Sequence, residues 1–118
     1  MDIKIGVDAR ILSKQLTGIG RYVLRMCSGL LKVKGVSLYL YSPAPILDQY
    51  LCDLDGAVIQ TMNIQSGILQ QVWGEVYLPY WAVKNKVDVF WGPAHRLPRL
   101  LSIDIAQVVT IHDLVWKY

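Results

Sequence analysis

The side chains best suited to proton transfer in this chain are its two histidines, and each follows a short apolar run. His95 and Arg96 lie in the loop after the run VDVFW, and His112 and Asp113 come directly after the run AQVVTI. A histidine has a pKa near neutrality, so it can accept or donate a proton or hydrogen-bond a hydroxyl. Asp113 can orient a ring nitrogen of His112 or cap a turn. A purely structural role for either histidine stays open.

A second candidate is the glycine pair in the sequence TGIGRY, which contains Gly18, Ile19, Gly20 and Arg21. A dinucleotide fingerprint needs a third glycine, a start directly after a strand, and an acid about 20 residues later on the next strand. Here Val23 stands at the third glycine position, and the glycines do not follow the first strand directly. The second strand also ends without an acidic residue, so no nicotinamide cofactor is expected. Two interpretations remain: backbone N–H groups at a helix N-terminus facing a phosphate or sugar oxygen, or a tight turn.

Other site chemistries have little support in the sequence. Cys27 and Cys52 form no CxxC pair and no His/Cys cluster with metal spacing, so no metal is expected. No P-loop or Ser-His-Asp order is present. The net charge of +3 is too small and too scattered to predict a nucleic acid partner. Asp8 and Arg10 could form a structural ion pair where the first strand ends.

Hydrophobic periodicity predicts the elements that must position these groups. Strands are expected at residues 3–8, 36–41, 57–62, 87–91 and 106–111, and helices at residues 17–34 and 66–83. Residues 46–54 form either a short helix or a loop. Pro79 should kink the second helix, or end it and begin another.

Each predicted helix carries an apolar stripe that should face the sheet. The first stripe consists of Ile19, Tyr22, Val23, Met26, Leu30 and Val33, opposite the basic residues Arg21, Arg25 and Lys32. The second stripe consists of Leu69, Val72, Trp73, Val76, Tyr80 and Val83. Thr17 and Ser66 are expected N-caps, Gly35 a left-handed C-terminal residue, and Cys27 a buried thiol. The last two strands are apolar enough to be buried on both faces.

The alternation of strands and helices predicts an α/β fold: a Rossmann-like parallel sheet with helices on both faces. We expect one domain spanning residues 1–118. The sequence is 53% hydrophobic and only 18% charged, so we expect one face to be covered by a second domain, a dimer mate or a membrane. It contains no signal peptide and no apolar run of about 20 residues, which predicts a soluble or at most peripheral protein.

Five segments, taken in order along the chain, resemble those of a known family: IGVDARIL, TGIGRYVLRMCSGLL, QQVWGEVYLP, VDVFWGPAHRLP and VVTIHDLVW. Together they resemble the N-terminal half of family 4 glycosyltransferases of the GT-B fold. The resemblance is strongest to bacterial mannosyltransferase-like members that build lipopolysaccharide O-antigens and other surface polysaccharides. It covers essentially the whole chain.

The resemblance implies a retaining transfer of a sugar from a nucleotide-diphosphate donor to a saccharide or lipid-linked acceptor, with no metal or other cofactor. It implies that His112 lines the sugar site near the reacting centre as the catalytic residue. It also implies that Gly18, Ile19 and Gly20 approach the donor diphosphate or the acceptor. Arg21 could assist there. The loop after the fourth strand, Gly92 to Pro98, which contains His95 and Arg96, would help to shape the acceptor pocket.

In this family the donor-binding groups, including paired glutamates, belong to a C-terminal domain that this sequence does not contain. We therefore expect a truncated, acceptor-side domain that is inactive by itself. We also expect a cytoplasmic location, possible contact with the inner face of the membrane, and a homo-oligomer as one way to cover the apolar face. The alternative is a non-catalytic α/β module that binds a nucleotide or a protein.

Overall fold

The computed structural model describes residues 2–14, 18–93, 97–102 and 104–110, and every structural statement below concerns these residues. Its strands are β1 (Ile3–Asp8), β2 (Val36–Ser42), β3 (Val58–Thr61), β4 (Val89–Gly92) and β5 (Ala106–Val109). Its helices are η1 (Arg10–Ser13), α1 (Gly18–Leu31), α2 (Asp48–Leu51), η2 (Cys52–Leu54) and α3 (Gly67–Lys84), where η denotes a 3-10 helix.

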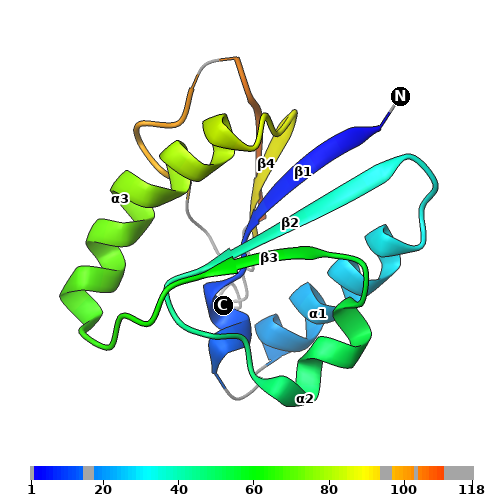
Figure 1. Cartoon of the computed structure of the whole chain (residues 1–118), viewed down its shortest axis with the longest axis horizontal. Helices are drawn as coiled ribbons and strands as arrows, with labels where there is room; N and C mark the ends of the chain where they lie inside the picture. Colours follow the sequence, from blue (N-terminus) through cyan, green and yellow to red (C-terminus); the bar gives the residue numbers. More distant parts are fainter. Residues whose placement is uncertain (1, 15–17, 94–96, 103, 111–118) are drawn as a thin grey trace, which may run out of the picture.

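The five strands form one sheet in the order β3-β2-β1-β4-β5, and all of its pairings are parallel (Figure 1). Parallel neighbours need crossover connections, which α1 and α3 supply. The predicted α/β, Rossmann-like fold is therefore confirmed. The short-helix alternative for residues 46–54 is also confirmed, because α2 and η2 fill that segment.

The side chains of β2 show how the sheet separates two hydrophobic cores. Leu38 and Leu40 pack in the core with α1 and α2, while Tyr41 packs in the core with α3. Figure 1 shows α1 and α3 on opposite sides of the sheet. Successive strand residues face opposite sides, so one apolar strand serves both cores. The strand is consequently almost continuously hydrophobic, as expected for a parallel strand covered on both faces.

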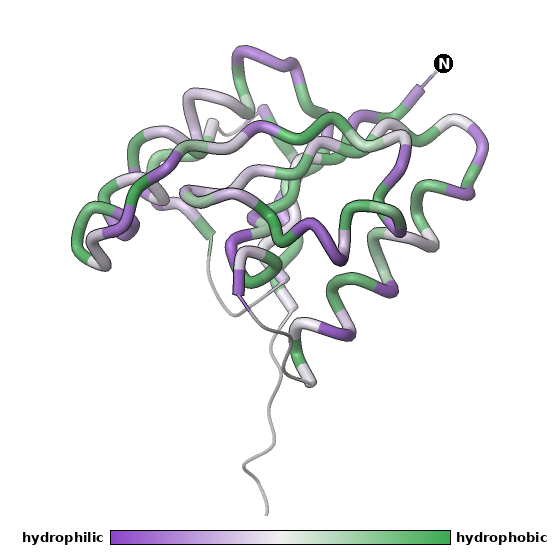
Figure 2. Tube along the Cα trace, turned by 60° about the horizontal axis from the view of Figure 1, so that its bottom comes forward, coloured by the Kyte–Doolittle hydropathy of each residue, from purple (hydrophilic) through white to green (hydrophobic). Residues whose placement is uncertain are grey.

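Helix α1 is amphipathic as predicted, but its buried line is narrower than the expected stripe. Val23 and Cys27 are fully buried, whereas Tyr22 and Met26 are 37% and 40% exposed. Hydrophobic and hydrophilic stretches alternate along α1 in Figure 2. Gly35, which follows the helix, has a φ of 87°, the left-handed conformation predicted for it.

Helix α3 excludes one of the two alternatives for Pro79 and corrects the expected buried stripe. It runs without interruption through Pro79, so it does not end and restart there. Its buried face carries Trp73, Leu78 and Trp81, while most of the predicted stripe is exposed. The exposed members of that stripe are Leu69, Val72, Val76, Tyr80 and Val83. The large rings occupy the core because they bury more apolar area than the valines would.

Strand β5 corrects a further expectation. Its four residues are all exposed, whereas we expected burial on both faces. It is an edge strand that pairs only with β4, and among the described residues no helix covers it. Strand β4 lies inside the sheet, and there Phe90 and Trp91 are buried as predicted. No helix in the described part of the chain is long and apolar enough to cross a membrane.

Candidate functional site

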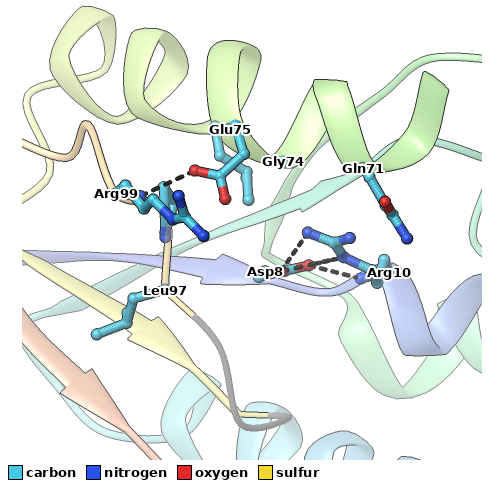
Figure 3. Close-up of a pocket in the computed structure, with 9 residues that line it drawn as sticks. Asp8, Arg10, Gln71, Gly74, Glu75, Leu97 and Arg99 are labelled. Atoms are coloured by element: carbon cyan, nitrogen blue, oxygen red, sulfur yellow. Dashed lines mark hydrogen bonds and ion pairs between the residues drawn. The ribbon is translucent and has the colours of Figure 1, made fainter. Parts of the chain in front are cut away.

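A pocket of about 510 Å³ opens at the carboxyl end of β1, beside α3 (Figure 3). Strands β2 and β3 extend the sheet on one side of β1, and β4 and β5 extend it on the other side, so the strand order reverses between β1 and β4. Open α/β sheets bind their ligands at such a switch point, beyond the carboxyl ends of the strands. The lining residues are Asp8, Arg10, Gln71, Gly74, Glu75, Leu78, Leu97, Pro98 and Arg99, and we call this the β1 pocket.

The floor of the β1 pocket contains the ion pair that the sequence predicted. Arg10 Nη2 donates to Asp8 Oδ2 at 2.8 Å, and Arg10 Nε donates to Oδ1 and Oδ2 at 3.0 and 3.1 Å. Asp8 is only 6% exposed, and a buried carboxylate needs such a partner. Because the chain turns into η1 directly after β1, a side chain two residues later can reach back to Asp8.

The guanidinium of Arg10 is fixed from a second side by α3. It lies over the Trp73 ring, with 5.1 Å between the guanidinium carbon and the ring centroid. A Cβ added to Gly74 would come within 2.5 Å of Arg10 Nη2. The missing side chain at Gly74 therefore lets the arginine lie against the helix while it holds Asp8.

The rim of the pocket carries polar side chains from α3. Gln71 and Glu75 stand one turn apart on α3, so they share a face of that helix. Glu75 Oε1 accepts a hydrogen bond from the Arg99 backbone N–H at 3.1 Å, which ties α3 to the loop that follows Leu97. Figure 3 shows Gln71 close to Arg10, and Glu75 turned toward Arg99.

The lining balances two carboxylates, Asp8 and Glu75, against two guanidinium groups, Arg10 and Arg99. Such a pocket offers hydrogen-bond donors and acceptors without a net charge. Leu97 and Pro98 add apolar surface beside them. Chemically, the arrangement suits an uncharged ligand with several hydroxyl groups better than it suits a phosphate.

The predicted glycine loop does not belong to the β1 pocket. Gly18, Ile19 and Gly20 are the first residues of α1, and none of them lines the pocket. Among the described glycines only Gly35 and Gly56 have positive φ, so neither Gly18 nor Gly20 adopts a left-handed conformation. They lie at a helix start, and a role in binding a phosphate or sugar oxygen stays a prediction.

Four further predicted site residues lie outside the described part of the chain. These are His95, Arg96, His112 and Asp113, and the predicted N-cap Thr17 lies outside it as well. Their proposed roles stay predictions. Arg21 is described, and it lies on the outer face of α1, in a different groove.

Sequence reasoning missed Gln71, Gly74, Glu75 and Arg99 as site residues. One signal was present: a glycine inside an otherwise regular helical pattern, directly before the only glutamate of the chain. A glycine in a helix is unfavourable unless something needs the space. Here the side chain of Arg10 needs it.

The groups with shifted pKa values lie away from the β1 pocket. Burial raises the pKa of the Cys27 thiol to about 12, so this cysteine is no nucleophile at neutral pH. Burial also raises the pKa of Tyr41 to about 12, against a smaller lowering by its hydrogen bond with Asn85. Both shifts follow from packing in the cores.

Neither a group of metal ligands nor a known relative adds to the description of this pocket. In residues 2–14, 18–93, 97–102 and 104–110, no three His, Cys, Asp or Glu side chains gather as metal ligands would. Comparison of the chain with protein-family models, curated proteins and solved structures finds no match.

Proposed function

We propose that this chain is the acceptor-side domain of a GT-B-type glycosyltransferase, and that the β1 pocket binds the acceptor saccharide. The enzyme would move a mannose-like sugar from a nucleotide-diphosphate donor to a saccharide or lipid-linked acceptor. One observation carries the proposal: a polar, charge-balanced pocket at the carboxyl end of β1, built from Asp8, Arg10, Gln71, Glu75 and Arg99.

The chemistry of the lining favours a sugar over a nucleotide as the ligand of this pocket. Sugar hydroxyls donate and accept hydrogen bonds, so they can use the Glu75 carboxylate, the Gln71 amide and the Arg99 guanidinium together. A diphosphate would instead meet the negative charges of Asp8 and Glu75. The apolar side chains of Leu97 and Pro98 suit the C–H faces of a sugar ring.

In the proposed reaction, this chain holds and orients the acceptor hydroxyl, which lowers the entropic barrier to transfer. Departure of a nucleoside diphosphate leaves positive charge on the donor sugar, the charge pattern of glycoside chemistry. Donor contacts belong to the C-terminal domain that the resemblance implies. His112 remains the proposed residue near the reacting centre.

Saccharide binding by the isolated chain tests the proposal without requiring turnover. The probes are methyl α-mannoside and a panel of neutral mono- and disaccharides, and the measurement is isothermal titration calorimetry. We expect a Kd on the order of 1 mM for the best ligand, which is ordinary for a small polar molecule in an open pocket.

Two substitutions and one control locate the binding. Glu75→Gln should weaken binding about tenfold or more, because it removes a charge-assisted hydrogen bond, and Gln71→Ala should weaken it about three- to tenfold. Gln49→Ala alters an exposed glutamine on α2, away from the pocket, and should leave the affinity unchanged. Failure of every saccharide to bind would contradict the proposal and favour the non-catalytic module.

A further inference from the structure

Helix α1 lies on the other side of the sheet from α3 (Figure 1). A second hollow lies there, between the outer face of α1 and η2. Its volume is about 500 Å³. It is lined by Arg21, Leu24, Arg25, Ser28, Gly29, Lys32 and Asp53, and we call it the α1 groove. The wall formed by η2 is fixed, because Leu54 is buried in the same core as Cys27.

The α1 groove concentrates positive charge. Arg21, Arg25 and Lys32 are separated by four and seven residues, so they lie along one stripe of the helix. Within the described residues, none of these three side chains makes a hydrogen bond or an ion pair. Asp53 is the only carboxylate in the lining, so three cations face one anion there.

Two of these cations, Arg21 and Arg25, are placed where they do not stabilise the helix. Arg21 lies in the first turn of α1, where the helix dipole favours negative charge, and that turn has no acidic residue. Arg21 and Arg25 also form a like-charge pair at i,i+4 spacing, which destabilises a helix slightly. A bound anion between them would relieve both unfavourable terms.

The groove also leaves room for a ligand at its helix wall. Gly29 lies in the last turn of α1, and a Cβ added to it would meet no atom within 4 Å. Nothing among the described residues therefore needs a glycine here, although glycine is a poor helix former. Beside it, Ser28 adds a hydroxyl to the lining. Cationic side chains, a hydroxyl and open space together suit phosphate oxygens.

We infer that the α1 groove binds a phosphate-bearing ligand through Arg21, Arg25 and Lys32. This site is separate from the β1 pocket, whose lining has balanced charge, and it does not depend on the proposed saccharide function. The phosphate group is the shared chemistry of two sources, a soluble phosphorylated molecule and a phospholipid headgroup.

A titration of the ¹⁵N-labelled full chain with inorganic pyrophosphate, followed by amide chemical shifts at low salt, tests the inference. We expect saturable shifts at Arg21 to Lys32 and at Asp53. Lys32→Gln should weaken binding about tenfold, because it removes a charge-assisted contact. Lys34→Gln makes the same change in net charge outside the groove and should have at most about a twofold effect.

A second pair of variants reverses the sign of the effect. Asp53→Asn removes the only carboxylate of the groove and should strengthen pyrophosphate binding several-fold. Asp104→Asn changes the net charge equally but lies before β5, so it should not strengthen binding. Equal effects of the two aspartate variants would overturn the inference, since the cations would then be only a solvated helix face.

Vesicle flotation distinguishes the two sources. Vesicles of phosphatidylcholine with phosphatidylglycerol are compared with vesicles of phosphatidylcholine alone. Binding to the anionic vesicles that Lys32→Gln weakens and Lys34→Gln does not supports a headgroup in the groove. Pyrophosphate binding without vesicle binding supports a soluble ligand. The absence of both would overturn the inference.

Discussion

At the scale of single residues, Arg10 and Gly74 depend on one another. The guanidinium of Arg10 is held by both carboxylate oxygens of Asp8 and by the ring of Trp73, so it cannot move aside freely. Gly74→Ala should therefore lower the free energy of unfolding by about 1–2 kcal/mol, even though alanine is the better helix former. Urea denaturation of the variant measures this.

Gly67→Ala is the matched control, because Gly67 begins the same helix and a Cβ there would meet no atom within 4 Å. It should be neutral or slightly stabilising. If Gly74→Ala were as well tolerated as Gly67→Ala, the close approach of Arg10 to α3 would be wrong.

The buried thiol of Cys27 makes stability depend on alkaline pH. Burial raises its pKa from 9.0 to about 12, so the folded state favours the neutral thiol. The stability that comes from keeping this thiol neutral is fully present below pH 9. It is lost as the pH rises from 9 toward 12, because in that range the thiol ionises only in the unfolded chain. Between pH 9 and 10 it should reduce the free energy of unfolding by about 1 kcal/mol.

Denaturation at these two pH values under reducing conditions measures that loss. Cys27→Ala should remove about 1 kcal/mol of the pH dependence, and Cys52→Ala should keep it, because Cys52 is exposed. An unchanged pH dependence in Cys27→Ala would contradict the assignment. The ordinary pKa of Tyr41 is 10.0, higher than that of Cys27, so Tyr41 changes the free energy of unfolding less between pH 9 and 10.

At the scale of elements, α3 illustrates what periodicity can and cannot predict. The sequence predicted a helix in the right place, with Ser66 as its cap, and Ser66 Oγ accepts from the Leu69 N–H at 3.4 Å. Of the predicted stripe only Trp73 is buried, and it shares the buried face with Leu78 and Trp81, which the sequence analysis did not include. Which stripe is buried depends on tertiary packing, where the larger side chains prevail.

The two faces of α3 should respond differently to truncation. Leu78 is fully buried and Val76 is 52% exposed. Leu78→Ala should lower the free energy of unfolding by about 2–5 kcal/mol, whereas Val76→Ala should change it by about 0.5 kcal/mol or less. Thermal or urea denaturation checks both variants. The reverse order would restore the orientation that the sequence predicted.

The exposure of β5 has a similar explanation. A short apolar run predicted the strand itself, at residues 106–111. Its environment depends on its place in the sheet, and the order β3-β2-β1-β4-β5 puts it at an edge. No local pattern in the sequence reports whether a parallel strand is central or lateral, so this part of the fold needed the structure.

At the scale of the whole molecule, the sequence predicted the architecture and only part of the site. Asp8 and Arg10 are close in sequence, so their pairing could be foreseen. Gln71, Glu75 and Arg99 reach the β1 pocket only because α3 crosses beside β1, which depends on the tertiary arrangement. The result is a domain with a charge-balanced pocket at one end of β1 and a cationic groove along α1.

The most direct test of the proposed function is an amide chemical-shift map of the ¹⁵N-labelled chain, titrated with methyl α-mannoside and neutral disaccharides. We predict saturable shifts for at least one saccharide, centred on Asp8, Arg10, Gln71, Glu75 and Arg99, with the α1 groove unaffected. No saturable shift with any saccharide, or shifts confined to residues outside the β1 pocket, would contradict the assignment of this pocket to the acceptor.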